Sequence, residues 1–183
     1  MLNNKTVVMD MDGVLADFEG AFCREFGYDH RELVSLEARY PNQAIRVREF
    51  INDGFVYKGL EPIELGLQIA RYLYEKKFFV SIVTSRPFGF DSVNRSWLKR
   101  HGVKFHSYVS DRHKTGRIAM INPLCAVDDL FSVHTGLLKH NIPTILVAQP
   151  WNQYSDEELR RVSTLSEFIS EFDRIIQENN EKL

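Results

Sequence analysis

Hydrophobic positions fall into short continuous runs, separated by longer stretches in which apolar residues have helical spacing. Short apolar runs that are rich in β-branched residues and bounded by polar residues are typical of strands buried on both faces. We predict such strands at Thr6–Met9, Phe78–Val83, Phe105–Val109, Cys125–Val127 and Thr144–Val147.

The stretches between the runs place apolar residues three and four positions apart, as on one face of a helix. We predict helices over residues 62–76, 91–100, 130–140 and 163–178. Pro62 suits a first helical turn, and Asp91 suits an N-cap. The alternation of strands and helices indicates an α/β fold with an open, doubly wound and mostly parallel sheet.

Residues 17–60 interrupt this alternation. They contain amphipathic pieces around Asp17–Phe26, Arg31–Glu37 and Gln43–Ile51, with scattered aromatic side chains and no strong strand. We therefore predict a small helical cap over residues 17–60, inserted after the first strand. Residues 1–16 and 61–183 would form the core domain.

Charge and composition narrow the classes of partner. The net charge is -2, so the chain lacks the basic excess typical of proteins that bind duplex nucleic acid. No stretch approaches the roughly 18 apolar residues of a membrane helix, and the first residues lack the apolar run of a signal peptide. Cys23 and Cys125 form no CxxC motif, which argues against a zinc site or a disulfide framework. We expect a cytoplasmic protein without a membrane partner.

Two carboxylates follow the first predicted strand directly. In an open α/β sheet, ligands bind beyond the carboxyl ends of the strands, where Asp10 and Asp12 would emerge. An extended chain would place both carboxylates on the same side, and such a pair is costly unless a cation neutralises it. Oxygen ligands suit magnesium. A hairpin turn, a calcium loop or an ordinary acidic corner are the competing interpretations.

Three further segments carry polar residues suited to phosphate chemistry. Thr84 and Ser85 end the second predicted strand and could hold a phosphate oxygen, or only cap the next helix. Lys114 could offer a point charge for a phosphate, or be an ordinary surface lysine. Asp128 and Asp129 end another strand and could bind a cation, or only favour the N-terminus of the next helix.

The order of these motifs is more specific than any one of them. Asp-x-Asp, Thr-Ser, Lys and Asp-Asp on successive strand ends resemble the four motifs of the haloacid dehalogenase (HAD) superfamily. In that superfamily an aspartate at the position of Asp12 is kept by phosphatases, so the resemblance implies phosphoester hydrolysis. The segments DMDGVLADFEGAF, GFVYKGLEPIELGLQIARYL, HKTG, DD and TILVAQPWN further resemble the 5′(3′)-deoxyribonucleotidase family, across residues 6–153.

The resemblance implies a catalytic role for five residues. Asp10 would attack phosphorus and form an aspartyl phosphate, which splits one displacement into two. Asp12 would protonate the leaving oxygen and later deprotonate the attacking water. Thr84, Ser85 and Lys114 would hold the non-bridging oxygens, on which charge develops.

The resemblance also implies a magnesium cofactor. Asp10, the Asp12 carbonyl and Asp128 would bind the ion, and Asp129 would lie beside it or bind it through water.

The expected substrate is a small phosphomonoester, namely a (deoxy)nucleoside monophosphate. Phe18, Phe22 and Phe55 are candidates to stack on a base, with a place in the cap core as the alternative. The family usually reads Thr-Ser-Pro at the end of this strand, whereas here Arg86 is inserted between Ser85 and Pro87. We assign Arg86 to substrate binding as well. A sugar phosphate, a nucleic-acid 3′ end and a catalytically silent binding protein on the same fold are the alternatives. A homodimer is also open.

Overall fold

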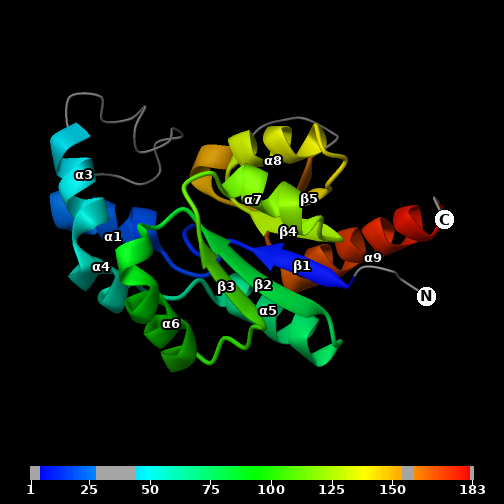
Figure 1. Cartoon of the computed structure of the whole chain (residues 1–183), viewed down its shortest axis with the longest axis horizontal. Helices are drawn as coiled ribbons and strands as arrows, with labels where there is room; N and C mark the ends of the chain where they lie inside the picture. Colours follow the sequence, from blue (N-terminus) through cyan, green and yellow to red (C-terminus); the bar gives the residue numbers. More distant parts are fainter. Residues whose placement is uncertain (1–4, 28–43, 154–158, 182–183) are drawn as a thin grey trace.

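The apolar runs form a parallel sheet of six strands. The computed structural model describes residues 5–27, 44–153 and 159–181 (Figure 1). The strands are β1 (Thr6–Met9), β2 (Phe79–Thr84), β3 (Ser107–Ser110), β4 (Cys125–Asp128), β5 (Thr144–Val147) and β6 (Arg160–Val162). Their order is β3-β2-β1-β4-β5-β6, so the winding direction reverses between β1 and β4. Ligands bind at such a switch point in open α/β sheets.

Helices cover both faces of this sheet. They are α1 (Phe18–Phe26), α3 (Ala44–Asn52), α4 (Gly54–Gly59), α5 (Glu64–Glu75), α6 (Asp91–Arg100), α7 (Lys114–Ile121), α8 (Phe131–Leu138) and α9 (Leu165–Glu181). α5 and α9 pack together on one face, and α7 and α8 pack together on the other (Figure 1). The predicted doubly wound α/β fold is therefore confirmed.

The strands are apolar throughout because both of their faces are buried. Val7 and Met9 of β1 point into the core that α5 and α9 cover, whereas Val8 points into the core that α7 and α8 cover. This alternation follows from the two-residue period of a strand. In α9, Phe168 and Phe172 are fully buried and stack on each other with ring centroids 5.5 Å apart.

Some predicted element ends were wrong. Asp91 was expected as an N-cap, but it is the first residue of α6, whose N-cap is Phe90, because a 3-10 turn at Phe88–Phe90 leads into the helix. Pro62 was expected in the first turn of its helix, but it precedes Ile63, the N-cap of α5. No element had been predicted for α7 or β6.

The segment predicted as a cap contributes α1, α3 and α4. The predicted helical piece Arg31–Glu37 lies outside the described residues. Phe18 of α1 packs on Phe50 of α3 and Tyr57 of α4, with ring centroids 5.2 and 5.9 Å away. Because α4 also packs against α6, these helices contact the core. The division into a core and a cap over residues 17–60 stays a prediction.

Both cysteines, Cys23 and Cys125, are buried, and neither is part of a disulfide. Burial raises the pKa of Cys125 to about 12. Within the three described ranges, no helix is both long enough and apolar enough to cross a membrane.

Candidate active site

A compact loop after β1 carries the first pair of carboxylates. The backbone N–H of Asp10 donates to Val127 O of β4 at 3.0 Å, so the end of β1 is held at the switch point of the sheet. Gly13 follows with a φ of 72°, in the left-handed region that favours glycine. A Cβ at Gly13 would lie 2.2 Å from Asp129 Oδ2, so a side chain there would push Asp129 away.

A lysine and three carboxylates form a buried cluster beside this loop. Lys114 Nζ lies 2.6 Å from Asp10 Oδ2 and 2.6 Å from Asp128 Oδ2. Asp129 is also buried, and oxygens of all three carboxylates lie within 4.8 Å of one another. One ammonium therefore faces three acidic groups, and the cluster carries an excess of negative charge when all of them are ionised.

Charge and burial shift the pKa values in this cluster. Burial raises the pKa of Asp10 to about 7, and the neighbouring Asp128 adds to the rise although Lys114 opposes it. Burial and then Asp128 raise the pKa of Asp129 well above its usual range. Burial alone would lower the pKa of Lys114, but Asp10 and Asp128 outweigh it and raise that pKa. Ionised carboxylates here need more positive charge than one lysine supplies.

The cluster fits a hard divalent cation. Among the described residues, Asp10 Oδ1 and Asp129 Oδ1 are buried without a hydrogen-bond partner, which is costly unless something else binds them. Carboxylate oxygens are the donors that magnesium prefers. The Asp12 carboxylate is not part of this group, and the participation of Asp12 through its backbone carbonyl stays a prediction.

Magnesium is expected to stabilise the protein more at about pH 8 than at about pH 5.5, since a protonated carboxyl must release its proton to bind metal. The pKa of Asp10 is raised from 3.8 to about 7, so its ionisation opposes folding above pH 7. This opposition disappears as the pH falls toward 3.8. Thermal melts with EDTA and with magnesium measure both effects.

The Asp10→Asn variant separates the effect of Asp10 ionisation on stability from the effects of other groups that titrate in the same pH range. The difference in stability between wild type and the variant in EDTA should change across this pH range. A difference that stays constant with pH would contradict the assignment to Asp10.

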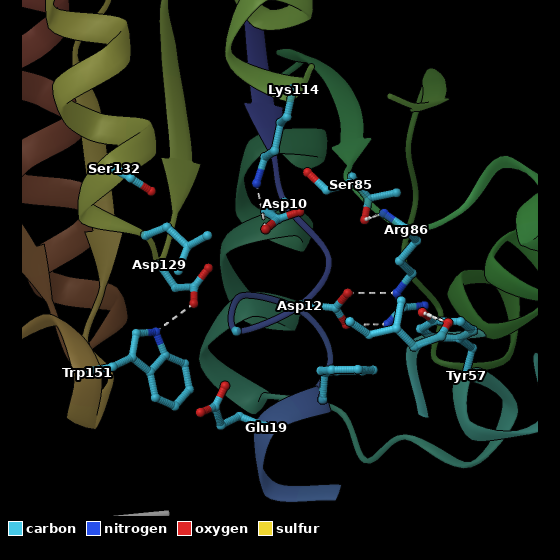
Figure 2. A pocket seen from close by; sticks show the side chains of 15 residues that line it. Asp10, Asp12, Glu19, Tyr57, Ser85, Arg86, Lys114, Asp129, Ser132 and Trp151 are labelled. Carbon is cyan, nitrogen blue, oxygen red and sulfur yellow. Dashed lines mark hydrogen bonds and ion pairs between the residues drawn. The ribbon is translucent and has the colours of Figure 1, made fainter. Parts of the chain in front are cut away.

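Asp12 is held by an arginine from the end of β2. Arg86 donates from Nε to Asp12 Oδ2 at 2.9 Å and from Nη2 to Asp12 Oδ1 at 2.5 Å (Figure 2). Burial alone would lower the pKa of Arg86, but the charge of Asp12 outweighs it and raises that pKa. Arg86 was predicted to bind substrate; in the structure its side chain is 1% exposed and is engaged by Asp12.

A cavity of about 390 Å³ opens over these groups. Its lining is Asp10, Asp12, Gly13, Phe18, Glu19, Ile51, Tyr57, Thr84, Ser85, Arg86, Lys114, Asp129, Leu130, Ser132 and Trp151. In Figure 2, Lys114 lies at one end of the view, and Trp151 and Glu19 lie at the other. Lys114 and Asp10 therefore lie toward one end of the cavity, and Trp151 and Glu19 toward the other.

All five residues predicted to be catalytic line this cavity. The side chain of Thr84 is buried, and its Oγ1 accepts a hydrogen bond from Arg86 N at 3.3 Å. Ser85 is exposed, and Lys114 begins α7. The structure thus brings residues from the ends of β1 and β2 and from the start of α7 to one place.

The three phenylalanines predicted to stack on a base have different surroundings. Phe18 is 9% exposed and lines the cavity. Phe22 has no exposed surface and packs between Phe26 and Phe50. Phe55 is 77% exposed but is not part of the lining, and Lys58 Nζ lies 4.9 Å from its ring centroid. The structure does not bring Phe22 and Phe55 to the cavity.

Sequence reasoning missed several groups in the lining. Tyr57 and Trp151 add aromatic surface, and Glu19 and Ser132 add polar groups. Trp151 donates from Nε1 to Asp129 Oδ2 at 2.8 Å, so its indole is fixed beside the acidic cluster. The aromatic residue in Gln-Pro-Trp-Asn was the available signal, but the sequence did not distinguish a lining residue from a packing anchor.

Comparison with known proteins identifies the family. A family model described as "5′ nucleotidase, deoxy (Pyrimidine), cytosolic type C protein" matches residues 4–170. No curated protein matches the sequence.

Solved structures share the fold. A predicted phosphatase from Clostridium acetobutylicum has a TM-score of 0.65 at 15% identity, covering 95% of this chain and 99% of that one. A HAD-superfamily hydrolase from Ehrlichia chaffeensis has a TM-score of 0.55 at 12% identity, covering 96% and 99%. The family match covers most of the chain and agrees with the motif residues gathered at the cavity. The chain therefore belongs to the deoxy (pyrimidine), cytosolic type C 5′ nucleotidase family.

Proposed function

We propose that the protein is a magnesium-dependent phosphatase of (deoxy)nucleoside monophosphates that acts through an aspartyl phosphate on Asp10. One observation carries the proposal. Asp10 lies in a buried cluster with Lys114 and two further aspartates, at the end of a cavity that Asp12 also lines. Cys23 and Cys125 are buried and form no disulfide, which suits a reducing compartment, so we place the enzyme in the cytoplasm.

Asp10 is the nucleophile in this proposal. A carboxylate oxygen attacks phosphorus, the ester oxygen leaves, and water then attacks the aspartyl phosphate to release phosphate and regenerate the carboxylate. Lys114 Nζ already lies 2.6 Å from Asp10 Oδ2, so a positive charge stands where the phosphoryl oxygens arrive. Positioning and charge supply most of the catalysis in phosphoryl transfer.

Asp12 is the general acid and then the general base in this proposal. It gives a proton to the leaving oxygen in the first step and takes one from water in the second. Thr84 and Ser85, on the β2 side of the cavity, would donate hydrogen bonds to the non-bridging oxygens.

The carboxylates of Asp10 and Asp128, with the Asp12 carbonyl, would hold magnesium, and Asp129 would lie beside the ion or bind it through water. When bound, the ion neutralises charge on the phosphate. It would also satisfy buried oxygens such as Asp10 Oδ1.

The residues that line the cavity support a nucleotide, rather than a small sugar phosphate, as the proposed substrate. Phe18, Tyr57 and Trp151 add aromatic surface to the cavity, and Glu19 adds a hydrogen-bond acceptor. Stacking on an aromatic side chain contributes about 1–3 kcal/mol per base. We therefore expect nucleoside monophosphates to exceed sugar phosphates in kcat/KM by roughly 5- to 150-fold.

Two substitutions at Trp151 test this expectation. Trp151→Leu removes the ring and should lower kcat/KM for nucleotides by roughly 5- to 150-fold, while ribose 5-phosphate, which carries no base, should change little. Trp151→Phe keeps a smaller aromatic ring but loses the Nε1 donor to Asp129, so it shows whether losing that hydrogen bond lowers turnover while an aromatic ring is still present. Equal losses on both substrates from Trp151→Leu would reduce Trp151 to a packing residue. A sugar phosphate hydrolysed faster than every nucleotide would end the nucleotide proposal.

A further inference from the structure

The guanidinium of Arg86 uses all of its nitrogens within the protein. Two of them form a fork on the Asp12 carboxylate, and Nη1 donates to Asn94 Oδ1 at 2.6 Å. A bidentate arginine–carboxylate pair fixes the plane of the carboxylate as well as its distance. A single flexible ammonium could not do this.

Arg86 is more deeply buried than the Asp12 carboxylate that it holds. The side chain of Arg86 is 1% exposed, whereas that of Asp12 is 29% exposed. The guanidinium carbon also lies 4.5 Å from the ring centroid of Tyr57, which supports the cation from another side. Both side chains line the cavity, and the carboxylate is the more exposed part of this pair (Figure 2).

A chain of hydrogen bonds holds Arg86 in turn. Asn94 is fully buried on α6 and donates from Nδ2 to Tyr108 Oη at 2.8 Å. Tyr108 Oη lies 2.8 Å from Ser110 Oγ, which donates to Asp91 Oδ1 at 2.6 Å. The Asn94 amide therefore bonds at both ends, since its Nδ2 donates to Tyr108 and its Oδ1 accepts from Arg86. The network connects α6 and β3 to the active site.

We propose that Arg86 is a positioning residue, which orients the Asp12 carboxylate toward the reacting oxygen through the fork that Asn94 holds in place. This inference rests on the proposed phosphatase function. Proton transfer requires a donor within hydrogen-bond reach of the leaving atom, so a displaced carboxylate loses rate although the nucleophile is intact. Arg86 is then a residue that acts through Asp12 and does not bind the phosphate.

Leaving groups of different basicity distinguish these roles. A nucleoside monophosphate has an alkoxide leaving group that must be protonated, whereas p-nitrophenyl phosphate has a leaving group that needs little protonation. Asp12→Asn and Arg86→Met should both lower kcat/KM for the nucleotide by roughly 100-fold or more, and for the aryl ester by less than about tenfold. For the nucleotide, the losses should appear in kcat and leave KM within about threefold of wild type. For the aryl ester the comparison is made in kcat/KM, which covers only the steps up to departure of the leaving group and not the later attack of water that Asp12 also assists.

A double-mutant cycle supplies the sharpest readout. If Arg86 acts only through Asp12, Asp12→Asn combined with Arg86→Met should be no slower on the nucleotide than Asp12→Asn alone. Losses that multiply would overturn the proposal. Equal losses on both esters with a raised KM would overturn it too, because they indicate direct binding of the phosphate.

Further variants keep the test independent of folding defects. Arg86→Lys keeps the charge without the fork. Asn94→Ala keeps the arginine but removes the side chain that holds its Nη1. Both should show a smaller loss with the same dependence on the leaving group. Arg117→Met is the matched control, since Arg117 pairs with Asp111 at 2.9 Å outside the cavity lining. It should turn over both esters like wild type. A wild type that hydrolyses neither ester with magnesium would overturn the proposed function and this inference together, whereas multiplying losses in an active enzyme would overturn only the inference.

Discussion

Asp10→Asn is expected to lower kcat/KM by at least about 10³-fold on every phosphomonoester, because a neutral amide is a far poorer nucleophile than a carboxylate. The substitution is isosteric and removes one of three acidic groups from a buried cluster. The variant should therefore fold at least as stably as wild type above pH 7 without magnesium, since the raised pKa of Asp10 makes its ionisation unfavourable there.

Steady-state kinetics on a nucleoside monophosphate and on p-nitrophenyl phosphate measure this loss. Asp173→Asn, an exposed aspartate on α9, is the matched control and should keep wild-type activity. Activity of Asp10→Asn within about tenfold of wild type would remove Asp10 from the role of nucleophile.

Lys114→Met is expected to damage both stability and activity. The ammonium lies 2.6 Å from two buried carboxylates, and its loss leaves them without their cation. Removing one partner of a buried ion pair typically costs about 3–5 kcal/mol of stability. The same charge would stabilise the phosphoryl oxygens, so we also expect a loss of roughly 10²- to 10³-fold in kcat.

Urea unfolding in EDTA and in magnesium tests the physical reason. The cation should restore part of the stability of Lys114→Met, because it supplies the positive charge that the cluster lacks. Lys139→Met, at an exposed lysine after α8, should unfold like wild type in both buffers. A Lys114→Met variant as stable in EDTA as wild type would show that the acidic cluster is not held by this lysine.

The apolar strands could be predicted from the sequence, whereas the edge strand β6 could not. β1 and β5 have the predicted bounds because each is paired on both sides and covered on both faces, which demands a continuous apolar run. β6 lies at the edge of the sheet and consists of Arg160, Arg161 and Val162, so it has no such run. α7 was missed because its first residue lies within a polar stretch and its N-cap, His113, makes no side-chain capping bond.

The positions of the site residues could be predicted better than their partners. Sheet topology brings strand ends together, so motif order was enough to place Asp10, Asp12 and Asp128 near one another. The pair between Arg86 and Asp12 depends on how side chains from two neighbouring strands turn, which no periodicity reveals. For the same reason, aromatic content could not distinguish Phe18, which lines the cavity, from the buried Phe22 on α1 or the exposed Phe55 on α4.

Acid-quenched turnover tests the central claim most directly. The enzyme is mixed with magnesium and an excess of a deoxynucleoside monophosphate, quenched in acid during turnover, digested and analysed by mass spectrometry. Our account predicts one added phosphoryl group on the peptide that contains Asp10, conversion of Asp10 to homoserine on borohydride reduction, and neither product in Asp10→Asn. Rapid turnover with the added group on another residue would contradict it.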